Sequence, residues 1–249
     1  MRPVERGNSP QAHDYENYRD AFPGLVSRLG AYCTYCERRI PTMLAVEHIQ
    51  PKGLPQYAAL IGQWDNFLLG CVNCNSTKKD QDVSLEHVLL PDRDNTAAAF
   101  AYTSGGEVVP AHGLTAAQQQ MAAHTLALCG LDKGPSEVTD ENGRIVAIDR
   151  YAQRMEVWGQ ALTSKADLAQ SPTEGMRRMI VKLAQATGFF SIWMQVFDDD
   201  VQMRRMLIDG FTREGHFFGF PGTARSCFDA NTRPVTPRPA NGLAHGSKS

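Results

Sequence analysis

The sequence predicts an α+β protein, in which a small unit of two strands and one helix precedes a mainly α-helical carboxy-terminal region. Two Cys-x-x-Cys pairs, Cys33/Cys36 and Cys71/Cys74, bracket two short apolar runs of strand length. From Leu114 onward the apolar residues recur at the three- and four-residue spacing of a helix. These observations place an irregular, cysteine-containing unit first and longer helices after it.

The composition is typical of a folded, soluble globular protein. The 249 residues are 42% hydrophobic and 21% charged, which excludes a wholly disordered chain or a fibrous repeat. The longest apolar stretch, 187–197, contains Gly188, Ser191 and Gln195 and is shorter than the roughly 20 residues of a membrane span. The first ten residues, MRPVERGNSP, lack the apolar core of a secretory signal. We therefore expect an intracellular, cytoplasmic protein with no membrane association.

Charge is unevenly distributed along the chain. The net charge of −2 gives no general reason to expect nucleic-acid binding. Residues 91–143 hold two basic and seven acidic side chains, whereas residues 144–249 hold 14 basic and ten acidic ones. The carboxy-terminal part is thus mildly basic. Its helical arginines form either a face that follows a phosphate backbone or an ordinary solvated helix side.

The first half of the chain divides into three predicted segments. Residues 1–30 form a helical segment whose candidate helix, 15–29, is broken by Pro23. Residues 31–90 read as turn, strand at 43–46, loop at 51–63, strand at 67–69, and a helix from Cys74. Residues 91–113 form a connecting region with a hairpin turn at 104–107.

The second half is predicted to be helical up to residue 228. Within the domain 114–228, the expected helices cover 114–128, 148–168, 175–197 and 201–211, and Gly130 ends the first of them. Residues 229–249 contain three prolines, two glycines and almost no large apolar side chain. We expect this tail to be disordered, because it buries too little surface to offset its ordering entropy.

The two cysteine pairs predict a structural zinc site. Zn²⁺ accepts four thiolates in a tetrahedron, and a two-residue spacer lets one tight turn direct two sulfurs at the same ion. The 34 residues between the pairs leave room for a hairpin. With Cys33, Cys36, Cys71 and Cys74 as ligands, the zinc has no open position and takes no part in catalysis. The alternatives are four unpaired core cysteines or a redox pair.

Polar residues beside the two predicted strands indicate chemistry near this site. His48 ends the first apolar run, where a rigid histidine can act as a general base, and Glu47 precedes it. Asn66 opens the second strand and provides a polar clamp. Asn75 follows the last cysteine, and Lys78 lies one turn further on the same helical face. Glu47 and Asn75 are oxygen ligands that suit a hard cation such as Mg²⁺ or Mn²⁺.

This segment, from Cys33 to about Lys79, resembles the HNH endonucleases, which have a ββα-metal fold around one catalytic divalent cation. The cysteine pairs, the acidic residue with its histidine, and both asparagines occur in the order of that family. The resemblance implies that His48 is the general base that activates water and that Asn66 holds the loop that positions it. It implies that Asn75 is a ligand of the catalytic cation. Glu47 departs from the more common Asp, and Asn75 from the more common His.

Hydrolysis of a DNA phosphodiester bond suits these residue types. The reaction needs an in-line water, a base, and a cation beside the scissile phosphate. We expect Lys78 to contact phosphate, and we assign Lys52 and Lys79 to the solvated surface. The alternative is a zinc-stapled module that has lost catalysis and only binds nucleic acid or protein. The presence of His48 together with Asn75 favours the enzyme.

A looser similarity extends beyond the motif. The segments MRPVERG, EHIQPK and NFLLGCVNCNSTK, with the helical carboxy-terminal region, are similar to the HNH nuclease subunit of Septu-type bacterial anti-phage systems. This resemblance implies a partner ATPase and a role as a defence effector.

Overall fold

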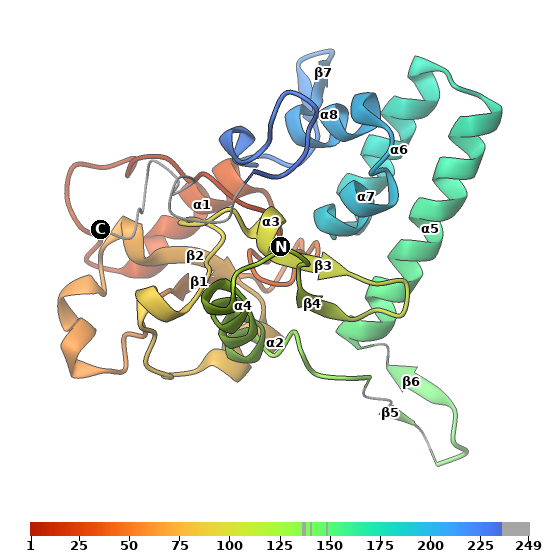
Figure 1. Ribbon diagram of the computed structural model, residues 1–249. Coiled ribbons are helices and arrows are strands. Elements are labelled where there is room, and N and C mark those ends of the chain that lie inside the picture. Colours follow the sequence, from red (N-terminus) through yellow and green to blue (C-terminus); the bar gives the residue numbers. More distant parts are fainter. Residues whose placement is uncertain (136–137, 140, 148, 236–249) are drawn as a thin grey trace.

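The computed structural model describes residues 1–135, 138–139, 141–147 and 149–235 (Figure 1). Two antiparallel strands, β1 (Ala45–His48) and β2 (Phe67–Gly70), pair with His48 opposite Phe67. The helix α2 (Val72–Lys78) follows directly. The elements therefore occur in the predicted order of strand, loop, strand and helix. β1 begins at Ala45 because Met43 has a positive φ of 65°, which ends extended structure there.

The helix α2 begins earlier than predicted, at Val72 rather than near Cys74. Cys71 has an extended backbone and its sulfur accepts a hydrogen bond from the backbone N–H of Cys74. A cysteine thus occupies the N-cap position that Ser or Asp usually fills. The turn that brings Cys71 and Cys74 together is therefore also the first turn of α2.

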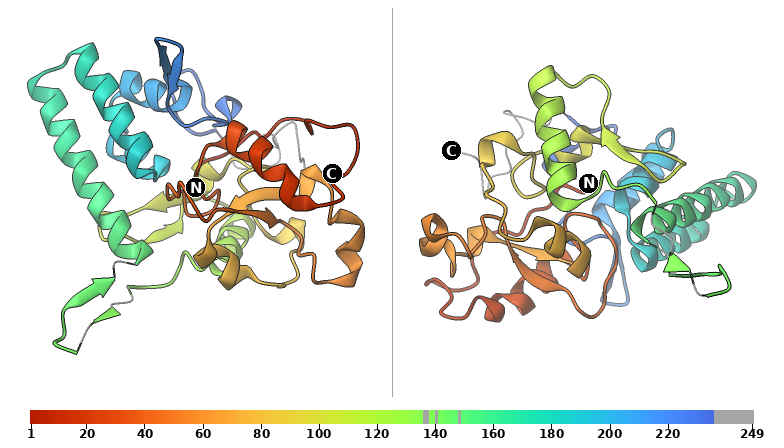
Figure 2. Two further views of the ribbon diagram at one scale, coloured as in Figure 1. Left: turned by 180° about the vertical axis from the view of Figure 1, so that it is seen from behind. Right: turned by 90° about the horizontal axis from the view of Figure 1, so that it is seen from below.

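The amino-terminal segment packs against the two strands. It contains the 3₁₀ helix η1 (Tyr18–Ala21) and the helix α1 (Phe22–Leu29), and α1 contacts both β1 and β2 (Figure 2, left). Pro23 lies in the first turn of α1, where its missing N–H has no helical partner to lose. Pro23 therefore starts this helix instead of breaking a longer one.

Short elements connect the core to the helices. The loop between β1 and β2 holds two 3₁₀ helices, η2 (Pro55–Leu60) and η3 (Trp64–Asn66). After α2 come η4 (Leu85–His87), α3 (Thr96–Ala99), and the hairpin of β3 (Phe100–Tyr102) and β4 (Val108–Pro110). The hairpin encloses the turn that the sequence predicts at 104–107.

The second half is built from helices. These are α4 (Ala116–Cys129), α5 (Arg150–Gln170), α6 (Glu174–Thr187), α7 (Phe190–Val196) and α8 (Val201–Asp209), with a hairpin of β5 (Val138–Thr139) and β6 (Ile145–Ala147) between α4 and α5. α4 packs against α2, and the pair α5 and α6 forms the side of the molecule away from β1 and β2 (Figures 1 and 2). Gly130 ends α4 in the left-handed conformation, as predicted.

The single helix predicted over 175–197 is interrupted. Gly188 and Phe189 have φ values of 80° and 55°, which separate α6 from α7. A Cβ at Gly188 would lie 2.6 Å from the carbonyl oxygen of Glu37, and the Phe189 N–H donates to that same oxygen at 2.9 Å. The helix is broken because the chain must approach the turn that carries the first cysteine pair.

The carboxy-terminal residues fold back on the molecule. A hairpin of β7 (Phe211–Arg213) and β8 (His216–Phe218) precedes η5 (Arg225–Cys227). Residues 229–235 differ from the predicted disordered tail, because Thr232 is fully buried and the side-chain amide of Asn95 donates to the Val235 carbonyl at 3.0 Å. Their contacts are made by backbone carbonyls, which an argument from apolar composition does not count. Residues 236–249 lie outside the described part of the chain.

Buried side chains from every segment form one contiguous hydrophobic core. It extends from the four cysteines through Phe67 and Leu126 to Trp193 and Phe220. Among the described residues, no helix combines the length and apolar character that crossing a membrane requires.

Candidate active site and metal centre

The four predicted cysteines lie together in a metal-binding arrangement. Cys33, Cys36, Cys71 and Cys74 are buried, unbridged, and have their sulfur atoms within 4.8 Å of one another. A tetrahedral Zn²⁺ with bonds of about 2.3 Å needs sulfur atoms about 3.8 Å apart, and the Cys36 and Cys71 sulfurs are 3.7 Å apart. Hydrogen bonds from the other thiols lower the pKa of Cys71, which favours its thiolate. The cluster fits a structural zinc ion.

Two arginines donate hydrogen bonds to this four-cysteine cluster. Arg150, the first residue of α5, reaches the Cys74 sulfur at 3.2 Å and also the carbonyls of Cys129 and Gly130 at the end of α4. Arg38 reaches the Cys71 sulfur at 3.5 Å. Four thiolates around one Zn²⁺ leave two negative charges, which two guanidinium groups balance. Arg150 thereby connects the cysteine cluster to both α4 and α5.

His48 is fixed at the end of β1 by contacts on three sides. Its Nε2 lies 3.0 Å from the Ile61 carbonyl oxygen. Because a carbonyl only accepts, Nε2 carries the proton in the neutral ring and Nδ1 is left as an acceptor. The rings of Phe67 and Tyr18 pack edge-on against the imidazole, with centroids 5.2 and 4.7 Å away. Burial lowers the pKa of His48, which favours the neutral imidazole that a base requires.

Asn66 ties down the loop that follows His48. Its side-chain oxygen accepts from the Gln50 N–H at 2.8 Å, and its amide nitrogen donates to the carbonyls of Gln50 and Leu60. Leu60 precedes Ile61, whose carbonyl contacts the histidine. Asn66 is itself 4% exposed, so these bonds are shielded from water. Asn66, the predicted clamp residue, thus joins the start of the loop at Gln50 to Leu60, next to the carbonyl that contacts His48.

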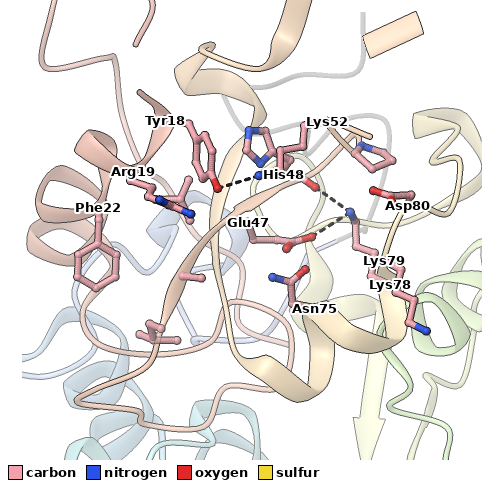
Figure 3. A pocket seen from close by; sticks show the side chains of 14 residues that line it. Tyr18, Arg19, Phe22, Glu47, His48, Lys52, Asn75, Lys78, Lys79 and Asp80 are labelled. Carbon is pink, nitrogen blue, oxygen red and sulfur yellow. Dashed lines mark hydrogen bonds and ion pairs between the residues drawn. The ribbon is translucent and has the colours of Figure 1, made fainter. Parts of the chain in front are cut away.

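Glu47 and Lys78 form a buried ion pair. The Lys78 Nζ lies 2.9 Å from Oε1 of Glu47 and donates to the carbonyl of His48 at 2.7 Å (Figure 3). The residues are 3% and 1% exposed. Burial raises the pKa of Glu47 and the lysine ammonium opposes that rise. This geometry differs from the predicted phosphate contact of Lys78, because its charge is already engaged below the surface.

The polar residues line a cleft of about 500 Å³ between the amino-terminal segment and α2. Glu47, His48 and Asn75 face into it, and in Figure 3 the Asn75 amide points toward the Glu47 carboxylate. One carboxylate and one amide, completed by water and phosphate oxygens, fit the ligand preference of Mg²⁺. Glu47 and Asn75 are therefore the residues that would hold a catalytic cation.

Several cleft residues escaped sequence reasoning. Tyr18, Arg19 and Phe22 come from η1 and α1, and Lys52, assigned to the solvated surface from the sequence, comes from the loop after β1. Lys52 lies only four residues after His48, which is a signal that the sequence offered. The amino-terminal side chains carry no comparable signal, because they are near His48 in space and some 30 residues away in the chain.

Three arginines of the suggested phosphate-tracking face are engaged within the protein. Arg150 binds the cysteine cluster, Arg154 is buried and donates to the Gly106 carbonyl, and Arg177 pairs with Asp200 at 2.6 Å. Burial and internal acceptors explain these positions better than solvent or nucleic acid does.

Comparison with known proteins agrees with the position of the site. Residues 33–81 match the family model described as HNH endonuclease. This segment contains all four cysteines, His48, Asn66 and Asn75. A comparison with curated proteins gives no match.

Proposed function

We propose that this protein is a metal-dependent endonuclease that hydrolyses phosphodiester bonds in DNA. The observation that carries the proposal is the placement of His48, whose Nε2 is bound by the Ile61 carbonyl while Glu47 and Asn75 line the same cleft. A base with a defined tautomer beside a hard-cation donor set is the arrangement that phosphodiester hydrolysis requires. The family match of residues 33–81 supports the same activity.

In the proposed reaction, Nδ1 of His48 accepts the proton of the water that attacks the scissile phosphorus. The Ile61 carbonyl stabilises the imidazolium that results, because Nε2 keeps its donor position. Asn66 keeps the loop and its carbonyl in place, and Lys78 holds Glu47 at the cleft floor. A divalent cation bound by Glu47 and Asn75 would supply positive charge beside the scissile phosphate and the leaving oxygen.

The direct test is incubation of purified protein with supercoiled plasmid in the presence of Mg²⁺, Mn²⁺ or EDTA. We expect conversion to nicked or linear DNA with either cation and none with EDTA. Binding without cleavage under all three conditions would instead support the alternative, a zinc-stapled binding module. The same assay with Asn75→Ala distinguishes the protein's own activity from that of a contaminating nuclease. If Asn75 is a ligand of the catalytic cation, this variant should cleave more slowly than the wild type and regain part of its rate at high Mn²⁺.

We further propose that the nuclease acts with a partner ATPase in defence against phage. This rests on the similarity of MRPVERG, EHIQPK and NFLLGCVNCNSTK to Septu-type nuclease subunits. Phosphate contacts alone carry no sequence information, so an HNH unit of this size gains its target from elsewhere. Affinity purification from the native cells should recover an ATPase, and recovery of the chain alone would argue against this role.

A further inference from the structure

One wall of the cleft comes from residues outside the family match. Tyr18, Arg19 and Phe22 belong to η1 and α1 and line the cleft, and the Tyr18 side chain lies beside His48 and Lys52 (Figure 3). The Tyr18 ring packs edge-on against the His48 ring, with the centroids 4.7 Å apart. The Tyr18 side chain is therefore in direct contact with the proposed base.

The cleft is more positive than the protein as a whole. Its lining includes four cations, Arg19, Lys52, Lys78 and Lys79, and two carboxylates, Glu47 and Asp80. Lys78 is neutralised by Glu47. Within the described part of the chain, no carboxylate forms an ion pair with the other three cations. A net negative protein thus presents unpaired positive charge around its candidate base.

Tyr18 and Lys52 form a defined pair within this lining. The Lys52 Nζ donates to the Tyr18 hydroxyl at 2.7 Å and lies 4.2 Å from the centre of its ring. An ammonium has three N–H groups, so two remain for another acceptor. The tyrosine oxygen accepts from Lys52, which leaves its own proton to donate. The ring contact holds the Lys52 ammonium in place. An anion that enters the cleft would therefore meet hydrogen-bond donors whose positions are already fixed.

We propose that Tyr18, Lys52 and Arg19 bind the backbone phosphate next to the scissile one in the DNA strand. The inference rests on the proposed function, since it places a neighbouring phosphodiester of the same substrate. A strand whose scissile phosphate lies between His48 and the Glu47 and Asn75 donors must pass one of the cleft walls. The wall of Tyr18 and Lys52 supplies hydrogen-bond donors and unpaired charge, which are what a phosphate oxygen binds.

The proposal is tested first by binding. A fluorescein-labelled DNA duplex is titrated with protein in buffer without divalent cations, at several KCl concentrations, and anisotropy gives Kd. Lys52→Met should weaken binding about tenfold, the equivalent of one charge-assisted hydrogen bond, and reduce the slope of log Kd against log salt by about 0.9. Arg19→Met, an independent variant, should reduce the slope similarly.

Tyrosine variants separate the hydroxyl from the ring. Tyr18→Phe keeps the edge contact with His48 and should weaken binding without changing the salt slope, because no charge is removed. Matched controls are Tyr57→Phe and Lys133→Met, since Tyr57 bonds to Asp82 and Lys133 to Thr77, both away from the cleft lining. Neither control should change Kd or slope.

Cleavage kinetics give the second readout. We expect Lys52→Met to raise KM while kcat changes less than twofold. A lowered kcat with unchanged KM and salt slope would mean that the pair only holds His48, and would overturn the phosphate subsite. Unchanged binding and kinetics in both charge variants would overturn it too. In either case cleavage by the wild type leaves the nuclease assignment standing, whereas a wild type that neither binds nor cuts DNA refutes the assignment and the subsite together.

Discussion

His48 is held by its neighbours more than by its own strand. The Ile61 carbonyl fixes the tautomer, and the Tyr18 and Phe67 rings fix the plane of the imidazole. Lys78 binds the backbone carbonyl of the same residue. The ring can therefore accept a proton without a rearrangement, which is the condition for efficient general-base catalysis.

At the same scale, Lys78 has a stability consequence. Lys78→Met leaves the Glu47 carboxylate buried without its partner, and we expect the free energy of unfolding to fall by about 3 to 5 kcal/mol. Urea unfolding of the variant and the wild type measures this difference in free energy. Lys79→Met is the control, because that neighbouring lysine is exposed and forms no ion pair with any described carboxylate.

A second substitution distinguishes a lost charge partner from poor packing. Combining Lys78→Met with Glu47→Gln removes the buried charge and should recover part of the lost stability while cleavage stays low. A loss below about 1 kcal/mol in Lys78→Met would show that Glu47 is solvated or protonated, contrary to the arrangement described.

At the scale of elements, the most informative contacts join helices to the four-cysteine cluster. Arg150 begins α5, binds the Cys74 sulfur, and satisfies two carbonyls at the end of α4. Glu37 follows Cys36 and accepts from the N–H and hydroxyl of Ser191 in α7, at 2.8 and 2.6 Å. Arg150 and Glu37 thus connect α4, α5 and α7 to the four-cysteine cluster.

We predict that Arg150→Met weakens zinc retention and lowers thermal stability together. The substitution keeps side-chain volume, removes the charge that balances the thiolates, and leaves the carbonyls of Cys129 and Gly130 without their donor. Competition with a chromogenic zinc chelator should show faster metal release than in the wild type. Arg178→Met is the control, since among the described residues Arg178 pairs only with exposed Glu174 on the same helix. Equal release rates in the two variants would contradict the role of Arg150.

The sequence predicts those parts of the fold and of the candidate site whose residues lie close together in the chain. The cysteine pairs, His48, Asn66 and Asn75 lie in one short segment, so their convergence follows from a hairpin and a helix. The break at Gly188 and the burial of Lys78 depend on contacts with Glu37 and Glu47, which lie far away in the chain. Tyr18 was missed for the same reason, because periodicity does not reveal which distant side chain covers an active residue.

At the scale of the whole molecule, the cysteine cluster belongs to a core shared by all segments. Removal of zinc should therefore destabilise more of the protein than residues 33–81. We expect hydrogen exchange to rise after chelation in β1, β2 and α2, and also in α7 and the first turns of α5, which Glu37 and Arg150 contact.

The hairpin β7 and β8 provides an internal control for that experiment, because its strands pair with each other and β8 packs against α6. Its exchange should stay close to that of the metal-loaded protein. Increased exchange confined to residues 33–81 would show that the helices fold and pack independently of the metal.

We propose that His48 is the base of a DNA-cleaving site, and single-turnover cleavage by His48→Ala tests this assignment. Wild type and variant are compared at equal zinc content and melting temperature, with Mg²⁺ and labelled plasmid. Loss of one general base predicts a rate reduced at least about 100-fold, with Kd for DNA changed little. A variant of intact fold and zinc content that cleaves at the wild-type rate would contradict the claim.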